Sequence, residues 1–432
     1  MNKMKITDIP WLPEISEDFL VGYVKQYFSI SKDLSKEGEP ERVLKLARTG
    51  IVEKDVTTNV GQMAASYAGY NKVQVGDLLL NPMDLYSGAN CNVAELNGVI
   101  SPAYANLRAK APHTIVPKFY DYYFKSQYWI MAMFAHGKGV SFDNRWTLNN
   151  DSLRTYEIPV APYAVQQRIV ECIQADEKKV NILIENVQIQ IEKLKAYKQS
   201  LITEVVTKGL DPNVPMKDSR VKNMGKIPDF WNIIRLKYLL SHIIDCPHET
   251  PVYSSDGEFY VIRTADQDVA KLRSDEAMYR LNKDEYYNRI RRQSLDAEDI
   301  VYGREGERWG LACLVPESNK YCLGQRMMQF RCQRDKVLPQ FMLYALSSRY
   351  VYQQGFEDTM GSTSPHVNIS SIRNYFIPIP PVIEQKEIAN KLSKKCFQID
   401  RLIDIKQAKI EKLEQYKRSL IYEYVTGKKE VF

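Results

Sequence analysis

The sequence contains nearly the same phrase twice, as KLKAYKQSLITEVVT at residues 193–207 and as KLEQYKRSLIYEYVT at residues 412–426. Ten of the fifteen positions are identical. A shift of 219 residues extends the match upstream without a gap, so that YEIPVAPYAVQQRI (156–169) falls on YFIPIPPVIEQKEI (375–388). A period this long indicates a duplicated domain, because the repeats of solenoid proteins run to about 20–50 residues.

Ahead of these matching segments the two halves differ in sequence but share an outline. VGDLLL (75–80) corresponds to AEDIVYG (297–303), and VPKFYDYYFKSQYW (116–129) resembles LPQFMLYALSSRYV (338–351). Residues 207–231, which join the halves, are rich in Gly, Pro, Asp and Asn, as is typical of a loop and linker. Each half therefore has a variable globular region followed by a shared terminal segment.

Composition limits the class of protein. A chain of 432 residues is too long for one typical domain, and its 44% hydrophobic content is enough for real cores. No stretch approaches eighteen uninterrupted apolar residues, so we expect no membrane span, and the N-terminus lacks a signal-peptide pattern. Seven scattered cysteines without a CxxC pair favour free thiols in the cytoplasm over disulfides or a zinc cluster.

The net charge of +6 does not by itself indicate DNA binding. Residues 376–432 carry 12 basic and 8 acidic groups, so most of the excess lies in the second terminal segment. The two variable regions are close to electrically balanced.

The shared segment predicts a long helix after its last proline, which is Pro162 in the first copy and Pro381 in the second. Apolar residues then recur at spacings of three and four, which predicts an a/d heptad seam that Lys198 and Lys417 interrupt at the same place. The predicted seam consists of Val180, Ile184, Val187, Ile191, Leu194 and Leu201 in the first copy and Ile399, Ile403, Ile410, Leu413 and Leu420 in the second.

Two interpretations of these helices are open. Each helix could cover the core of its own domain, or the two could pair with one another along their seams. The narrow apolar stripe, the charged outer faces and the length of about 32 residues favour an intramolecular antiparallel pair. At 1.5 Å per residue such a pair would form a rod of roughly 48 Å with one globular region near each end.

These residues carry a resemblance to a known family, the specificity subunits of Type I DNA restriction–modification systems. Its carriers are IPIPPVIEQKEI (377–388), the looser IPVAPYAVQQRI, and the ends YKQSLITEVVTKG and YKRSLIYEYVTGK. AEDIVYGREGERWGLACLV (297–315) resembles a strand–turn–strand of the family, and GSTSPHVNISSIRNYFIPIPP (361–381) resembles the run into its second conserved helix. The resemblance covers nearly the whole chain in the expected order.

The resemblance implies an α+β fold with two mixed α/β target-recognition domains, separated by two long antiparallel coiled-coil helices in a pseudo-two-fold tandem repeat. It divides the chain into a first target-recognition domain (1–160), a first conserved spacer helix (161–210), a linker (211–230), a second target-recognition domain (231–376) and a second conserved spacer helix (377–432).

The family also implies a function. Each domain reads one half of a bipartite, asymmetric sequence in double-stranded DNA, and the helices set the spacer. The chain would perform no catalysis alone and would direct two modification (methyltransferase) subunits, which carry S-adenosylmethionine, and restriction (translocase and endonuclease) subunits. The chain itself is expected to bind no cofactor. The first copy departs from the family pattern at Ala161 and Val165, and its residues 75–91 lack the Arg-Gly step of the second copy.

Catalytic motifs are missing or incomplete in the sequence. NPMD (81–84) lacks the second proline and the aromatic residue of a methyltransferase tetrapeptide, so we interpret it as a turn. DCPHET (245–250) brings Cys246 and His248 together without further ligands, and we predict no metal site. No GxxxxGK[ST] motif occurs. A fused methyltransferase and a purely structural coiled-coil scaffold are the competing hypotheses, and neither accounts for two divergent globular regions without catalytic motifs.

Polar and basic residues in loops of the variable regions are the candidate DNA contacts. Arginine suits guanine, and asparagine suits adenine. For the arginines of YGREGERWG (302–310) the alternative is salt bridges with neighbouring glutamates, and for those of YNRIRRQS (287–294) it is phosphate contact or a solvated face. The candidates are Asn90, Asn92, Asn144 and Arg145 in the first region, and Arg289, Arg291, Arg292, Arg304, Arg308, Ser362, Thr363 and His366 in the second.

Overall fold

A computed structural model describes residues 3–38, 40–47, 50–56, 64, 66–83, 85, 91–111, 113–139, 146–360 and 365–431. The chain forms two compact units, which we call unit 1 (Met1–Val187 and Ala408–Phe432) and unit 2 (Gln188–Gln407). The units do not follow the predicted domain boundaries, because each one includes part of both long helices.

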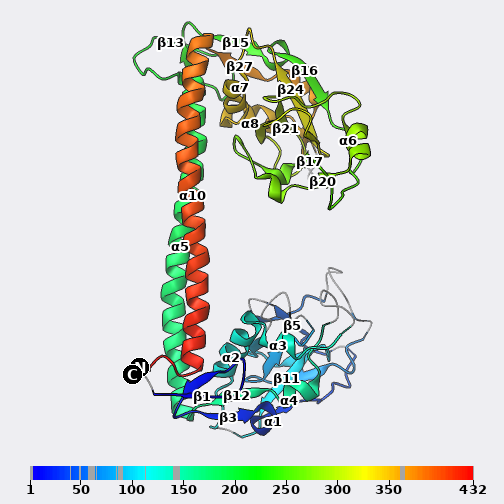
Figure 1. Cartoon of the computed structure of the whole chain (residues 1–432), viewed down its shortest axis with the longest axis vertical. Helices are drawn as coiled ribbons and strands as arrows, with labels where there is room; N and C mark the ends of the chain where they lie inside the picture. Colours follow the sequence, from blue (N-terminus) through cyan, green and yellow to red (C-terminus); the bar gives the residue numbers. More distant parts are fainter. Residues whose placement is uncertain are drawn as a thin grey trace. The chain divides into compact units, whose positions relative to one another are not determined.

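Two long helices run through both units (Figure 1). Helix α5 (Tyr163–Lys208) has 46 residues and helix α10 (Val382–Val425) has 44. They begin directly after Pro162 and Pro381, where the restrictions that proline imposes on the backbone end. Both helices are therefore longer than the seam pattern alone predicted.

The two helices pair in antiparallel fashion within each unit. In unit 1, the hydroxyl of Tyr424 donates to Asp176 Oδ2 at 2.9 Å, and Lys417 Nζ donates to Asn181 Oδ1 at 3.2 Å. Residue numbers rise along α5 as they fall along α10, which confirms the predicted antiparallel direction.

The same direction holds in unit 2. There Lys406 Nζ donates to Gln190 Oε1, and Lys198 Nζ contacts both carboxylate oxygens of Asp400 at 2.8 and 2.9 Å. All of the predicted seam residues are buried or partly buried.

The covering interpretation also holds at the helix ends. In unit 1, Ile169 and Ile173 from the start of α5 and Ile421 from the end of α10 belong to the main core. In unit 2, Ile202 of α5 and Ile388 of α10 do the same. The ends of each helix thus complete the globular cores, and the stretch between them follows the heptad seam.

The core of unit 1 is a four-stranded sheet of order β4-β11-β8-β9, with helix α2 packed against β8 and β9. Smaller sheets surround it. The elements are β1 (Met4–Ile6), β2 (Glu14–Ser16), β3 (Leu20–Tyr23), α1 (Val24–Tyr27), β4 (Phe28–Ile30), β5 (Leu44–Ala47), β6 (Gly50–Glu53), β7 (Asn71–Val73), β8 (Leu78–Leu80), β9 (Cys91–Val93), β10 (Gly98–Ile100), β11 (Ala105–Ala109), α2 (Pro117–Trp129), α3 (Ala132–Ala135), α4 (Asn150–Arg154) and β12 (Glu157–Val160).

Unit 2 has a four-stranded sheet of order β16-β24-β21-β22, with helix α7 against β22 and β24. Its elements are β13 (Met216–Asp218), β14 (Lys226–Pro228), β15 (Asn232–Arg235), η1 (Leu236–Tyr238), β16 (Leu240–Asp245), β17 (Phe259–Ile262), η2 (Thr264–Asp266), β18 (Gln267–Asp268), β19 (Lys271–Leu272), η3 (Asp275–Ala277), β20 (Arg280–Leu281), α6 (Lys283–Arg289), β21 (Ile300–Gly303), β22 (Ala312–Leu314), β23 (Tyr321–Leu323), β24 (Met327–Cys332), α7 (Pro339–Leu346), α8 (Arg349–Glu357), β25 (Thr359–Met360), β26 (His366–Val367), α9 (Ile369–Arg373) and β27 (Phe376–Ile379).

The two units share their plan of strand pairing. The first central strand is followed in space by the fourth, second and third in both sheets, and β3-β12 corresponds to β15-β27. The predicted strand–turn–strand of residues 297–315 is confirmed, because β21 pairs antiparallel with β22 from Ile300–Leu314 to Tyr302–Ala312. In unit 1, β8 pairs with β9 in the same way.

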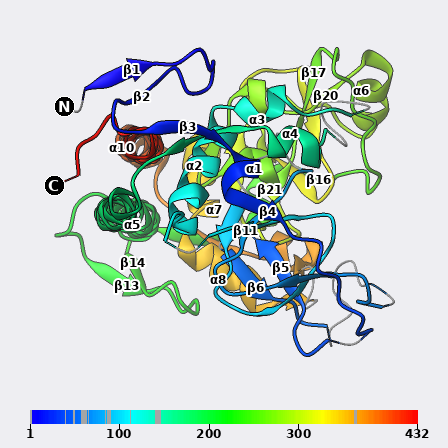
Figure 2. The ribbon, with the colours of Figure 1, turned by 90° about the horizontal axis from the view of Figure 1, so that it is seen from below.

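Residues 211–230 were predicted to be a loop and linker, and this prediction is wrong in part. They contain the hairpin β13-β14. Its counterpart in unit 1 is the hairpin β1-β2, which lies beside the C-terminal end of α10 (Figure 2). There Ser16 N donates to Thr426 O at 2.9 Å, and Lys428 pairs with Glu14 at 2.9 Å. Such three-residue strands of mixed polarity carry little periodic signal in the sequence.

No helix within the described ranges is long and apolar enough to cross a membrane. All seven cysteines are free thiols, and six of them are buried.

Candidate nucleic-acid interface

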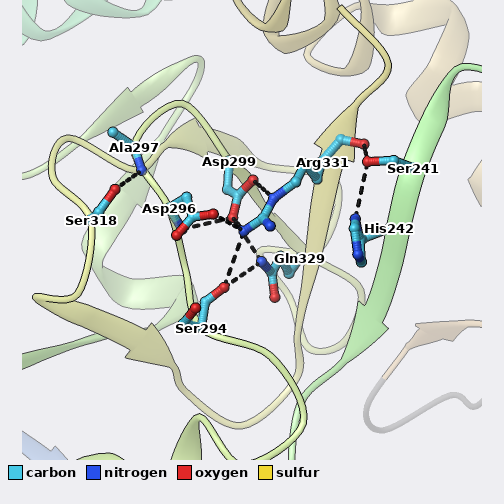
Figure 3. A network of polar contacts seen from close by, with 9 residues as sticks. All are labelled: Ser241, His242, Ser294, Asp296, Ala297, Asp299, Ser318, Gln329 and Arg331. Atoms are coloured by element: carbon cyan, nitrogen blue, oxygen red, sulfur yellow. Dashed lines mark hydrogen bonds and ion pairs between the residues drawn. The ribbon is translucent and has the colours of Figure 1, made fainter.

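A buried aspartate anchors the turn before β21 (Figure 3). Asp299 is 2% exposed and accepts from Arg331 Nε at 2.8 Å, from Gln329 Nε2 at 2.7 Å and from the backbone N–H of Asp296 at 2.8 Å. The hydrogen bond from Arg331 to Asp299 raises the pKa of the guanidinium. The network ties the turn to β24 and so determines where β21 and the loop after it begin.

Unit 1 repeats this arrangement around Asp77, which is also 2% exposed. Arg108 donates to it through Nε at 2.8 Å and NH2 at 2.7 Å, and Asn106 Nδ2 donates at 3.0 Å. The backbone N–H of Gln74 takes the place that Asp296 N has in unit 2. The aspartates of the matching VGDLLL and AEDIVYG segments therefore anchor the turn before a central strand in both units.

Arg304, directly after β21 in unit 2, is paired within the protein. Its side chain is only 9% exposed and lies 3.0 Å from Asp245 and 2.7 Å from Glu305. The ion pair with Glu305 is the structural alternative that the sequence analysis left open. Base contact by Arg304 stays a prediction that this placement does not favour. To reach a base, the guanidinium would have to give up its ion pairs with Asp245 and Glu305, which would leave buried charges unpaired.

Arg308 lies on the same loop and is exposed, and its guanidinium donates to the carbonyl of Gln267. His366, on β26, is half-buried, and its backbone forms an isolated antiparallel β-bridge with that of Glu305. The structure thus brings the strand of His366 against the loop that carries Arg304 and Arg308, although these residues are about 60 positions apart.

The three arginines around the end of α6 have different environments. Arg289 is 5% exposed and donates to the carbonyls of Glu249 and Leu323, at 2.8 and 2.9 Å. A side chain held in this way supports the loop and is not presented to a ligand. Arg291 and Arg292 are exposed, as the prediction of phosphate contacts requires.

Five of the predicted contacts lie outside the described residues, namely Asn90, Asn144, Arg145, Ser362 and Thr363. Asn92 is described and lies on β9 opposite Leu79, where it is half-buried.

Residues 246–250, which the sequence suggested only as possible metal ligands, leave the core for the surface. Cys246 is buried, whereas His248 is exposed and bonded through Nε2 to Asp245 at 2.9 Å. Within the ranges that the structure describes, no group of three or more His, Cys, Asp or Glu side chains is arranged to hold a metal ion. Arg326 was not predicted from the sequence, and it is exposed next to this segment with a φ of 73°. Neither feature has a periodic signal in the sequence.

Comparisons with known proteins agree on one family. Residues 248–415 match the model of the Type I restriction modification DNA specificity domain. The MjaVIII specificity subunit of Methanocaldococcus jannaschii, a Type I restriction enzyme, is 23% identical over 95% of this chain and 87% of its own. The putative MjaX specificity subunit of the same organism is 26% identical over 66% of this chain and 62% of its own.

The fold has a solved counterpart as well. A chain from the structure of a type I R-M system matches with a TM-score of 0.66 at 15% identity, over 95% of this chain and 98% of that one. The family model over residues 248–415 and the relatives matched by sequence agree, so the chain is similar to the specificity subunits of Type I DNA restriction–modification systems.

Proposed function

We propose that this non-catalytic subunit directs a modification complex to a bipartite, asymmetric target in double-stranded DNA. Unit 1 reads one half-site and unit 2 reads the other. The observation that carries the proposal is that both units build the same four-stranded sheet, anchored by the same buried aspartate, but carry different side chains in the loops around it. Two sheets of the same topology that carry loops of different sequence are suited to reading two different half-sites.

The helices α5 and α10 set the length of the unread spacer. Each is a single helix that belongs to unit 1 at one end and to unit 2 at the other. A helix rises 1.5 Å per residue, so each of these helices is roughly 65–70 Å long, which is more than enough to span the 34–36 Å between the centres of half-sites one helical turn of DNA apart.

Two modification subunits bind the chain, and they carry S-adenosylmethionine and the methyl-transfer chemistry. The repeated segments at residues 193–207 and 412–426 support this stoichiometry, because two identical partners need two similar surfaces. Restriction subunits join the same complex.

Mapping methylated adenines in cells that express the chain with its cognate modification subunit tests the proposal. We expect one bipartite motif that disappears when the gene for this chain is deleted. A methylome that does not change on deletion would contradict the proposal, and so would a single uninterrupted motif.

A further inference from the structure

The segment 246–250 leaves the edge strand of the central sheet of unit 2. Strand β16 ends at Asp245, and the buried Cys246 donates its backbone N–H to Met327 O at 3.1 Å. Pro247 is also buried, whereas His248, Glu249 and Thr250 are exposed. The chain therefore turns from the core to the surface within three residues.

The backbone of this segment is held from the protein side. Arg289 donates to Pro247 O at 3.2 Å and to Glu249 O at 2.8 Å, while Gln325 Nε2 donates to His248 O at 2.9 Å. Three consecutive carbonyls are thus bonded to two side chains. A segment fixed in this way loses little conformational entropy on binding a ligand, because its backbone is already ordered.

The side chain of His248 is oriented but accessible. Its Nε2 lies 2.9 Å from Asp245 Oδ2, and the imidazole is 59% exposed. The same Nε2 lies 3.5 Å from Arg304 NH2, so both contacts use Nε2 and Nδ1 is the ring nitrogen that can contact a base. A ring nitrogen without a proton accepts a hydrogen bond, as from the exocyclic amino group of adenine or cytosine.

Glu249 is exposed, and its carboxylate has no ion pair within the described part of the chain. Carboxylates accept hydrogen bonds from cytosine N4. Two exposed arginines, Arg292 and Arg326, lie near the segment. Arg292 NH1 lies 3.4 Å from Asp245 O, and Arg326 accepts from Arg304 N through its backbone carbonyl. These guanidinium groups give the negatively charged DNA backbone a place to bind beside the two acceptors.

Unit 1 has a different sequence at the equivalent place. Strand β4 takes the position of β16 in its sheet, and it is followed by SKDLS (31–35) where unit 2 has CPHET (246–250). The segment that follows the edge strand therefore has unrelated side chains in the two units.

We infer that His248 and Glu249 are specificity-determining residues of unit 2, that they read amino groups of bases in its half-site, and that Arg289 is the positioning residue that presents them. The inference rests on the proposed function, because it assigns the readout of one half-site to named residues.

The test is the methylation motif of single variants in the intact complex. His248→Ala and Glu249→Gln each remove one acceptor from an exposed position, so folding should not change. We expect discrimination at one or two base pairs of one half-site to fall by roughly 5- to 150-fold, with the spacer and the other half-site as in the wild type. His242→Ala, on the same strand β16, is the matched control and should keep the wild-type motif.

Arg289→Lys tests the positioning role. It keeps the charge but loses the two-pronged contact with the carbonyls. We therefore expect reduced base discrimination at the same base pairs that His248→Ala and Glu249→Gln affect. General instability would instead weaken all positions equally, which would contradict this role.

Two results would overturn the inference. One is a wild-type motif in both His248→Ala and Glu249→Gln, and the other is a uniform loss of methylation at all sites, which indicates phosphate contact only. A wild-type complex that yields no bipartite motif would instead count against the proposed function itself.

Discussion

At the scale of single residues, one glutamine in each copy explains why the segment before each long helix is repeated. Gln166 and Gln385 are both 0% exposed. Gln385 accepts from Leu338 N at 2.8 Å and donates to Pro380 O at 2.9 Å and Lys336 O at 3.0 Å. Gln166 makes the equivalent three bonds in unit 1. Each glutamine therefore joins the first turn of its helix to the globular part of its unit.

Replacing Gln385 by Met, which keeps the volume, should lower the free energy of unfolding of unit 2 by about 2–4 kcal/mol. The physical reason is that buried backbone groups of Leu338, Lys336 and Pro380 lose their partner. The change in the free energy of unfolding is measured by denaturant unfolding, with limited proteolysis used to monitor each unit. Gln407→Met, at an exposed helix position, is the control and should change stability by less than about 0.5 kcal/mol. Equal stability of the two variants would contradict the role of Gln385.

Asp176 should make the helix pair of unit 1 sensitive to acid. Its hydrogen bond from Lys179, followed by that from Tyr424, holds the pKa of the carboxyl below its usual value. A carboxyl with a depressed folded-state pKa contributes stability above the unfolded pKa, and this contribution is lost as the pH falls through the folded value. Because the site is partly solvated, we expect less than about 1 kcal/mol, lost below about pH 4.

The pH effect is measured as the difference in unfolding midpoint between the wild type and Asp176→Asn. We expect this difference at neutral pH and its disappearance in acid. If the difference in unfolding midpoint grew as the pH fell, the ionised Asp176 carboxyl would not be the stabilising form.

At the scale of elements, a lysine in each seam distinguishes the two halves of the helix pair. Lys198 is 5% exposed and pairs with Asp400 at 2.8 Å. The equivalent Lys417 is more exposed, pairs with Glu414 of its own helix at 2.9 Å and donates to Asn181, which stands where Asp400 does in the other half. The shift of 219 residues relates Lys198 to Lys417 and Asp400 to Asn181, so only in unit 2 is the lysine's partner on the other helix charged.

Replacing Asp400 by Ala should destabilise unit 2 by about 3–5 kcal/mol, because a buried ammonium is left without its counter-ion. The double variant Lys198→Met with Asp400→Leu should recover most or all of this loss, since an apolar pair of similar size removes the charge as well. A double-mutant cycle in denaturant measures the coupling. Additive effects of the single variants would show that the pair contributes nothing specific.

At the scale of the whole molecule, the proposed spacer function depends on helix length. Deleting one heptad from both helices, residues 184–190 of α5 and 408–414 of α10, keeps the seam in phase. The loss of seven residues shortens each helix by roughly 10 Å, which is about three base pairs of DNA. We therefore expect the spacer of the methylation motif to shorten by about three base pairs while both half-sites stay the same.

Deleting the heptad from α5 alone is the matched control. It puts the two seams out of register, so we expect a loss of stability and of methylation instead of a new spacer. Altered half-sites in the double deletion would argue that the helices take part in base recognition.

The sequence by itself determined the duplication, the two long helices, their seam and the resemblance to specificity subunits. All of these follow from patterns that recur along the chain, either at a shift of 219 residues or at the heptad spacing. Helix starts were also predictable, because proline acts locally on its own backbone and on the preceding residue. The repeated phrase at residues 193–207 and 412–426 thus indicated the helical frame and not the candidate DNA contacts.

Only the tertiary structure decided which of these polar residues are exposed and which are enclosed. Arg289 and Arg304 looked like DNA contacts in the sequence, but both are enclosed by partners from segments that lie tens of residues away. His248 looked like half of a metal site, and the structure exposes it on a braced segment. The reason is physical: exposure and hydrogen bonding depend on contacts between segments distant in sequence, which periodicity and composition do not record.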